Sequence, residues 1–191
     1  MTEKLTVAAV QASPEFLDRD ATVQKVVRLT KEAAGLGARL IVFPETFVPT
    51  YPDWVWRAAA WDGPFEALTA KLRDQAVTVP SSATEELAKA ARRAKAYLSV
   101  GVNELDGGTV YNAQLVFGPD GDLIRKHRKL MPTGGERLVW GFGDGSDLDP
   151  GRHAVRSRRR PDLLGEPDAA GACGALPGRR RGLPRADGRR L

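Results

Sequence analysis

The stretch from Arg39 to Tyr51 constrains the fold more than any other part of the chain. Leu40 to Phe43 is a short unbroken apolar run, which is typical of a strand buried on both faces. Pro44 ends such a strand because proline has no N–H to donate. Glu45 therefore follows directly after a strand end, where open α/β sheets place catalytic and ligand-binding groups. On this stretch alone, a solvated loop carboxylate or a helix cap explains Glu45 equally well.

The preceding sequence predicts a β-α-β unit. Leu5 to Val10 is typical of a first buried strand, and Asp20 is a candidate cap for a helix that continues to about Ala34. With the strand at 40–43, this order predicts a parallel pair of strands joined by a right-handed crossover.

The following hundred residues predict two helices and then a mainly β half. Ser82-x-x-Glu85 is a candidate capping box, and Asp106-Gly107-Gly108 is a candidate hairpin turn. We therefore expect an α/β body with mixed strand pairing. The predicted helices are 65–76 and 82–96, and the predicted strands are 97–102, 110–117 and 123–127.

A second charged group begins at the end of the last of these strands. Lys126-His127-Arg128-Lys129 precedes a loop that Pro132 and Gly134-Gly135 should structure. Taken alone, such a basic run is most often a solvated face or an anion contact. A carboxylate and a lysine at two strand ends would, however, suit a site that moves a proton and stabilises an oxyanion.

Composition limits the function classes. The chain has 191 residues with 42% hydrophobic residues, enough for one domain with a core, and it has one cysteine, which excludes an internal disulfide framework and fits a reducing cytoplasm. No apolar run reaches the length of a membrane span, and the first residues lack a signal-peptide pattern. We expect a cytoplasmic protein with no membrane partner.

The net charge of +5 is unevenly distributed. Residues 151–191 hold 11 arginines, no lysine and 4 acidic residues, a net of +7, whereas residues 1–150 hold 18 basic and 20 acidic residues, a net of −2. A basic tail can be a nucleic-acid arm, but these arginine clusters lack the interleaved aromatic residues that stack on bases. We therefore predict no nucleic-acid partner.

Several motifs together resemble the nitrilase branch of the carbon–nitrogen hydrolase superfamily. They run in the family's order over about residues 4–148, and as a set they are highly specific. They are Val7-Ala8-Ala9-Val10-Gln11-Ala12, Phe43-Pro44-Glu45-Thr46-Phe47, Tyr51-Pro52, His127-Arg128-Lys129-Leu130-Met131-Pro132-Thr133, Glu136-Arg137-Leu138-Val139-Trp140-Gly141 and Gly143-Asp144-Gly145-Ser146.

The resemblance implies an α/β fold, namely part of a four-layer α-β-β-α sandwich that usually assembles into homo-oligomers. It implies that Glu45 is the general base, that Lys129 stabilises charge developing on the substrate nitrogen or the tetrahedral intermediate, and that Glu136 is a supporting carboxylate. Tyr51 and Trp54 are the expected substrate-pocket residues, although clustered aromatics such as Trp54, Trp56 and Trp61 more often form core or subunit interface. The substrate would be a small nitrile, with no cofactor and no metal.

The family's nucleophile is missing from the expected place. It is a cysteine in a Cys-Trp-Glu-Asn type motif at a strand end, two dozen or more residues after the second glutamate. The one cysteine here, Cys173, stands in a Gly/Ala stretch with no apolar strand before it. We do not expect Cys173 to serve as nucleophile.

Residues 150–191 also depart from the family in composition. Residues 151–191 contain no Ile, Phe, Tyr, Trp, Met, Lys, Asn, Gln or Thr, which leaves little apolar surface to offset ordering entropy. Such a tail is either a natural disordered segment or the product of a shifted reading frame. The second is favoured, because Leu163-Leu164-Gly165-Glu166-Pro167 written as CTG-CTG-GGA-GAA-CCT gives Cys-Trp-Glu-Asn when it is read from the second base.

The sequence thus predicts two parts: 1–149, the N-terminal portion of a nitrilase-like domain, and 150–191, a basic tail of disordered or irregular structure outside the family pattern. The chain as written should hydrolyse nitriles little or not at all, since it lacks the thiolate. The alternatives are an amidase of the same superfamily and a non-catalytic truncated subunit or binding protein.

Overall fold

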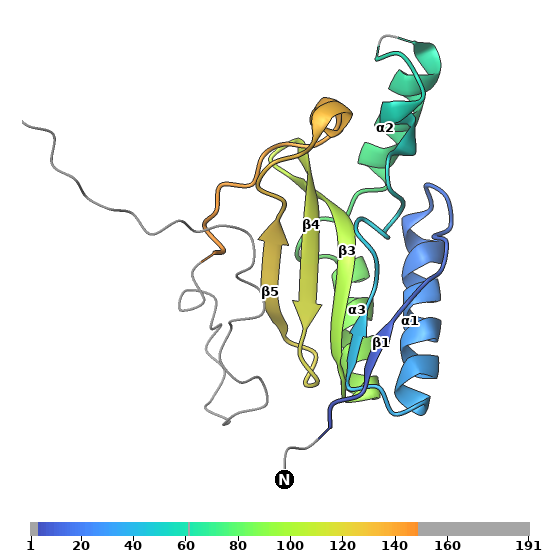
Figure 1. Ribbon diagram of the computed structural model, residues 1–191, viewed down its shortest axis with the longest axis vertical. Helices are drawn as coiled ribbons and strands as arrows, with labels where there is room; N and C mark the ends of the chain where they lie inside the picture. Colours follow the sequence, from blue (N-terminus) through green and yellow to red (C-terminus); the bar gives the residue numbers. More distant parts are fainter. Residues whose placement is uncertain (1–3, 61, 149–191) are drawn as a thin grey trace, which may run out of the picture. The chain divides into compact units, whose positions relative to one another are not determined.

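The computed structural model describes residues 4–60 and 62–148, which form one mixed sheet with three α-helices (Figure 1). The strand order follows the chain, β1-β2-β3-β4-β5. β1 pairs in parallel with β2 and β2 with β3, whereas β3, β4 and β5 are antiparallel neighbours. The strands are β1 (Val7–Ala9), β2 (Leu40–Val42), β3 (Tyr97–Asp106), β4 (Thr109–Phe117) and β5 (Leu123–Arg128).

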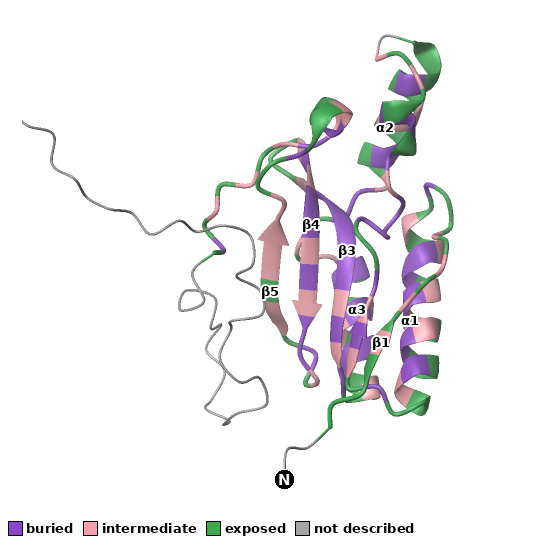
Figure 2. Cartoon of the chain, in the orientation of Figure 1, coloured by how far each residue is buried: buried purple, intermediate pink, exposed green. Residues whose placement is uncertain are grey.

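The helices α1 (Arg19–Gly35) and α3 (Ser82–Ala94) pack on each other and on one face of the sheet. Their apolar residues join the alternate residues of β3 and β4 that point to this side, and together they form the main core. Figure 2 shows this buried material along α1, β3 and β4. The core includes Val26, Leu87, Leu98, Val100, Val102 and Leu115, which are fully buried.

A second, smaller core lies under α2 (Gly63–Asp74) and the short 3₁₀ helix η1 (Asp53–Trp56). It contains Leu17, Trp54, Val55, Phe65 and Leu72. Another 3₁₀ helix, η2 (Gly134–Leu138), is the last regular element before the described part of the chain ends at residue 148. The predicted α/β class with mixed pairing is confirmed, and the described residues supply one helix layer and one sheet of the expected sandwich.

Two predicted caps are wrong by one or two residues. Asp18, not Asp20, caps α1, and its side chain accepts a hydrogen bond from the Ala21 N–H. Ser81 caps α3 in a capping box with Thr84, in place of the predicted pair that begins at Ser82. The sequence pattern does not distinguish neighbouring cap candidates, because several residue types can accept a hydrogen bond from the free N–H groups of the first helical turn.

The outer face of the sheet is less buried than the sequence predicts. β1 is an edge strand in which Val7 is 53% exposed, so the expected buried first strand is wrong. In β2 only Ile41 is buried, while Leu40 and Val42 are half-buried. The reason is that helices cover one face of the sheet in the described part of the chain, and an apolar run cannot say how many faces are covered.

The β3–β4 hairpin follows the predicted turn. Asp106 pairs with Thr109 across a two-residue loop in which both Gly107 and Gly108 have positive φ. This left-handed pair matches the twist of the flanking strands and favours glycine at both positions.

No helix in residues 4–60 and 62–148 is long and apolar enough to cross a membrane. The predicted boundary at 149/150, the tail and Cys173 lie outside the described residues.

Candidate active site

Glu45 lies in the turn that follows β2, as the sequence predicts. This turn crosses β3 at Gly101, where a Cβ would stand 2.8 Å from the Glu45 carbonyl carbon and closer still to Pro44 O and Thr46 N. Only glycine permits this approach. Thr46 has a φ of +43°, a left-handed conformation that is unusual for a threonine. The backbone that presents Glu45 is therefore held in a tight and specific shape.

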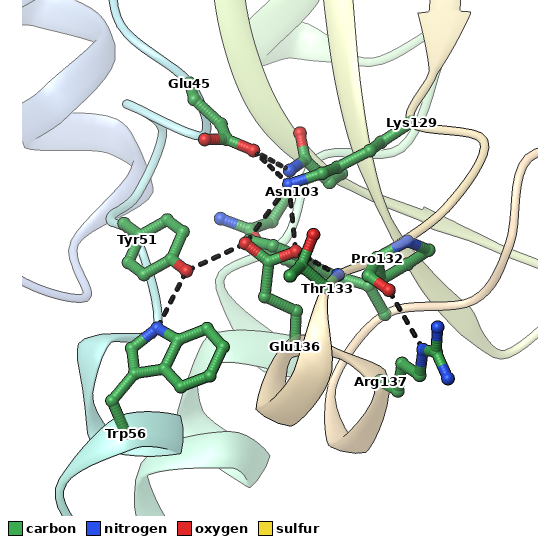
Figure 3. Close-up of polar contacts among 11 residues, drawn as sticks. Glu45, Tyr51, Trp56, Asn103, Lys129, Pro132, Thr133, Glu136 and Arg137 are labelled. Carbon is green, nitrogen blue, oxygen red and sulfur yellow. Dashed lines mark hydrogen bonds and ion pairs between the residues drawn. The ribbon is translucent and has the colours of Figure 1, made fainter.

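Lys129 follows β5 directly, and its backbone N–H donates to Asn112 O on β4 at 2.8 Å. Its ammonium lies between two carboxylates (Figure 3). Lys129 Nζ is 2.8 Å from Glu45 Oε1, 2.8 Å from Glu136 Oε2 and 3.1 Å from Glu136 Oε1. Two residues 84 positions apart in the sequence thus meet at one site.

Glu136 belongs to η2, and its side chain is 5% exposed. Its carboxylate accepts hydrogen bonds from the Thr133 N–H at 2.7 Å and from the Tyr51 hydroxyl at 2.8 Å. Gly134 and Gly135 bring η2 against η1, because a Cβ at Gly135 would stand 2.7 Å from Val55 O. The two 3₁₀ helices therefore fix Glu136 beside Lys129.

Lys129 and Glu136 each stabilise the charged form of the other. Burial opposes the charge on Lys129, but hydrogen bonds to Glu136 and Glu45 raise the pKa of its ammonium. Burial likewise opposes the charge on Glu136, yet Lys129, the Thr133 N–H and the Tyr51 hydroxyl lower the pKa of this carboxyl. Lys129 and Glu136 are thus held as an ammonium and a carboxylate at neutral pH.

The predicted pocket residues Tyr51 and Trp54 lie in different places. Tyr51 joins the cluster: its hydroxyl donates to Glu136 and accepts the indole N–H of Trp56 at 3.0 Å. Burial, and to a smaller extent Glu136, raise the pKa of Tyr51. Trp54 packs in the small core under α2 and donates to Thr69 Oγ1 at 3.1 Å. The tryptophan hydrogen-bonded to this network is Trp56, which is half exposed.

Sequence reasoning missed two residues that shape the site, Asn112 and Asn103. Asn112 Nδ2 donates to Glu45 Oε1 at 2.5 Å. Trp140 donates through its indole N–H to Asn103 Oδ1 at 2.8 Å, and Asn103 Nδ2 donates to Thr50 O at 2.8 Å. No pattern in the sequence marked the two asparagines, because they belong to the set of alternating residues in β3 and β4 that does not face the helices, where polar residues are ordinary.

The basic run at 126–129 is not a solvated face. Lys126 and Arg128 form ion pairs with the buried Glu104, while His127 Nδ1 lies 2.6 Å from Asp147 Oδ2. The sequence left this alternative open because a run of cations does not reveal carboxylates that come from distant strands.

Two further features were found among the described residues. A cavity of about 330 Å³ lies between α2, the β3–β4 turn and η2, but none of Glu45, Lys129 and Glu136 lines it. Within residues 4–60 and 62–148, no group of three or more His, Cys, Asp or Glu residues could hold a metal ion.

A carboxylate that follows β2 meets a lysine that follows β5, backed by a second, buried carboxylate, and such an arrangement can carry acid–base chemistry of the kind that hydrolases use. The carbon–nitrogen hydrolase family matches residues 6–154, and the chain belongs to this family.

Among curated proteins, the chain is 51% identical over 145 residues to "Nitrilase 3" from an unknown prokaryotic organism, covering 74% of this chain and 43% of that protein. It is 50% identical over 143 residues to a nitrilase of Bacillus sp. (strain OxB-1), covering 75% of this chain and 41% of the relative. An aliphatic nitrilase of Sinorhizobium fredii (strain HH103) is 49% identical over 153 residues, with 76% and 48% covered. The chain spans less than half the length of these relatives.

Solved structures of this superfamily share the fold. Nit3 of Saccharomyces cerevisiae, a member of branch 10 of the nitrilase superfamily, matches with a TM-score of 0.55 and 25% identity over 73% of this chain and 49% of that chain. An amidase from Nesterenkonia sp. matches with a TM-score of 0.55 at 17% identity over 73% and 48%.

Proposed function

We propose that this chain carries the carboxylate and lysine groups of a nitrile-hydrolysing site, with Glu45 as general base, Lys129 as the cation that stabilises developing charge, and Glu136 as the supporting carboxylate. The meeting of Glu45, Lys129 and Glu136 within hydrogen-bond distance carries the proposal. Nitrile hydrolysis yields a carboxylic acid and ammonia and consumes two waters.

In the proposed reaction a cysteine thiol gives its proton to the Glu45 carboxylate as its sulfur attacks the nitrile carbon. The C≡N bond becomes a thioimidate C=N, and negative charge develops on nitrogen beside Lys129. Water then replaces nitrogen, ammonia leaves, and a second water releases the acid from the acyl-enzyme. Glu136 keeps the Lys129 ammonium in place throughout, since it holds Nζ from the side away from Glu45.

The nucleophile is the part that these 191 residues do not supply at the expected place, because Cys173 is the only cysteine. Cys173 lies outside the described residues. We propose that a shifted reading frame from about residue 150 replaced a Cys-Trp-Glu-Asn motif at 163–167, and that the 191-residue chain does not turn over nitriles.

A nitrile substrate is favoured over an amide by the sequence comparisons. The relatives at about half identity are nitrilases, whereas the amidase structures match at 16–18% identity and show the fold alone. The amidase alternative predicts that primary amides are hydrolysed faster than the matching nitriles.

The test has two arms that measure ammonia release from aliphatic and aryl nitriles and the matching amides. The first arm uses the purified 191-residue chain, for which we expect no turnover; measurable nitrile hydrolysis would refute the proposed inactivity. The second arm uses a chimera of residues 1–148 joined to the remaining C-terminal part of Nitrilase 3, which supplies a complete chain. We expect this chimera to hydrolyse nitriles.

Variants of the chimera test the roles proposed for Glu45 and Lys129. Glu45→Gln and Lys129→Ala should each lower kcat/KM by about 10²–10⁴-fold, the usual worth of a positioned acid–base group. Glu32→Gln is the matched control, because Glu32 is an exposed carboxylate paired with Arg28 on α1. If Glu45→Gln were no worse than Glu32→Gln, the assignment of Glu45 as base would be wrong. Sequencing the coding DNA across codons 145–170 tests the frame shift independently.

A further inference from the structure

The two oxygens of the Glu45 carboxylate have different surroundings. Oε1 accepts hydrogen bonds from Asn112 Nδ2 at 2.5 Å and from Lys129 Nζ at 2.8 Å. No described residue donates to Oε2, and the Glu45 side chain is 49% exposed. Figure 3 shows one oxygen directed toward Lys129 and the other directed away from it. Since two donors withdraw charge from Oε1, Oε2 is the oxygen left to accept a proton.

Asn112 contacts both members of this pair. Its side-chain amide holds Glu45, and its backbone carbonyl accepts the Lys129 N–H at 2.8 Å. The residue is buried in β4 directly opposite Asn103 of β3. Its position is fixed by strand pairing on both sides, because β4 is hydrogen-bonded to β3 and β5. A rigid strand thus sets the distance between the base and the cation.

We propose that Asn112 is a positioning residue that binds Glu45 Oε1 and so presents Glu45 Oε2 as the proton acceptor of the site. This inference rests on the proposed function. The proton of the attacking thiol goes to Oε2, so that an S–H bond breaks and an O–H bond forms. The Oε1 hydrogen bonds to Asn112 and Lys129 persist, and the carboxyl does not rotate during the transfer.

The chemistry at position 112 explains why an amide suits this role. An aspartate there would place a second carboxylate at hydrogen-bond distance from Glu45, and the two would compete for one proton. An apolar side chain would leave Glu45 Oε1 with Lys129 as its single donor. Asn112→Asp is therefore the informative variant, because it keeps the side chain's size and the backbone bond to Lys129 while it replaces the donor by an acceptor.

The first experiment measures the side-chain amide signals of Asn112 by NMR in the 191-residue chain. At neutral pH these signals should move markedly in Glu45→Gln, because the substitution replaces the carboxylate oxygen that accepts from Asn112 Nδ2 by a neutral amide. The matched control is Gln114, whose amide donates to the neutral Ser99 Oγ at 2.7 Å and should not respond to the Glu45 substitution. Asn112 signals that are indifferent to Glu45→Gln would overturn the proposal.

The second experiment uses the nitrilase chimera described above. Asn112→Asp should lower kcat by about 100-fold, the scale of a misplaced catalytic group, and should shift the acid limb of the pH–rate profile upward. KM should change much less, because Asn112 acts through Glu45. Gln114→Glu adds a carboxylate two residues further along β4, on the same face as Asn112, and should change kcat less than about threefold.

The outcomes separate this inference from the proposed function. An active chimera in which Asn112→Asp and Gln114→Glu behave alike would overturn the positioning role. An inactive parent chimera would count against the proposed function alone, and the side-chain amide signals of Asn112 would then decide whether Asn112 holds Glu45. Protection of the Lys129 amide from hydrogen exchange, which depends on the Asn112 carbonyl, verifies that Asn112→Asp keeps the strand pairing.

Discussion

Two clusters of carboxylates and cations lie on opposite faces of the same strands. On the helix side, Glu104 of β3 binds Lys126 and Arg128 of β5, whose register partners Leu115 and Ala113 belong to the main core. On the other face, Glu45 and Glu136 bind Lys129. Both clusters pair carboxylates with cations at or just after the end of β5, yet they differ in how completely each carboxylate is hydrogen-bonded.

Glu104 has no remaining capacity for a substrate. Its side chain is 1% exposed, Arg128 binds Oε2 at 2.7 Å and Oε1 at 2.8 Å, and Lys126 binds Oε1 at 2.5 Å. Glu45, in contrast, is half exposed and keeps Oε2 without a donor among the described residues. A saturated cluster stabilises a fold, whereas an unsaturated one can accept a proton, and this difference separates the structural carboxylate from the candidate catalytic one.

The largest expected effect comes from breaking the saturated cluster. Glu104→Gln removes the charge between two cations and should lower the free energy of unfolding by about 3 kcal/mol, since it leaves Arg128 without its buried partner. Glu45→Gln should change it by less than about 1 kcal/mol, because that side chain is partly solvated. Urea denaturation of both variants measures this. Equal losses would show that the two clusters are equally structural.

The second effect concerns how the chain presents Glu45. Gly101→Ala should lower the free energy of unfolding by about 2 kcal/mol, because its Cβ would collide with the backbone of residues 44–46 and that backbone would have to move. Gly35→Ala is the control, since a Cβ at Gly35 meets nothing within 4 Å. The urea midpoint of each variant reports the cost. A tolerated Gly101→Ala would show that the turn after β2 is not held against β3.

The third effect is a dependence on pH. Burial opposes the charge of Glu104, but hydrogen bonds from Arg128 and Lys126 lower the pKa of its carboxyl. A lowered folded-state pKa contributes stability above the unfolded value of about 4.3, and this stability is lost as the pH falls through the folded pKa. The stability difference between the unmodified chain and Glu104→Gln should therefore be full at neutral pH and shrink below about pH 4. A constant difference in urea midpoints from pH 7 to pH 3 would contradict this.

The comparison also shows what the sequence could predict. Glu45 was found because an apolar run, a proline and a carboxylate are adjacent in the chain, so the local pattern carries the signal. The ion pairs of Lys126 and Arg128 were not predicted, because their partner Glu104 lies on another strand 22 and 24 positions away. Strand register determines such pairs, and a single sequence does not give the register.

Burial was predicted less well than element type for a similar reason. β1 and β2 are strands at the expected places, but their outer side is open in the described residues, since burial depends on what covers a sheet. Asn112 and Asn103 were overlooked because an asparagine within an alternating strand is indistinguishable, in sequence, from a surface residue. Their role follows from contacts that only the fold creates, in which Asn112 binds Glu45 and Asn103 binds Trp140.

Glu136 combines properties of both clusters and gives the smallest effect. It is nearly as buried as Glu104, but one of its donors is the neutral Tyr51 hydroxyl. Tyr51→Phe should lower the free energy of unfolding by about 1 kcal/mol, the usual worth of a hydrogen bond to a buried group. It should also raise the pKa of Glu136, because a donor to the carboxylate is lost. Carbon-13 NMR follows the titration of the Glu136 carboxyl.

The control is Trp56→Phe, which removes the hydrogen bond that the Tyr51 oxygen accepts from the indole N–H. It should leave the Glu136 titration almost unchanged. If both variants shifted the Glu136 titration equally, the hydroxyl would act through the aromatic packing of the site and not as a direct donor.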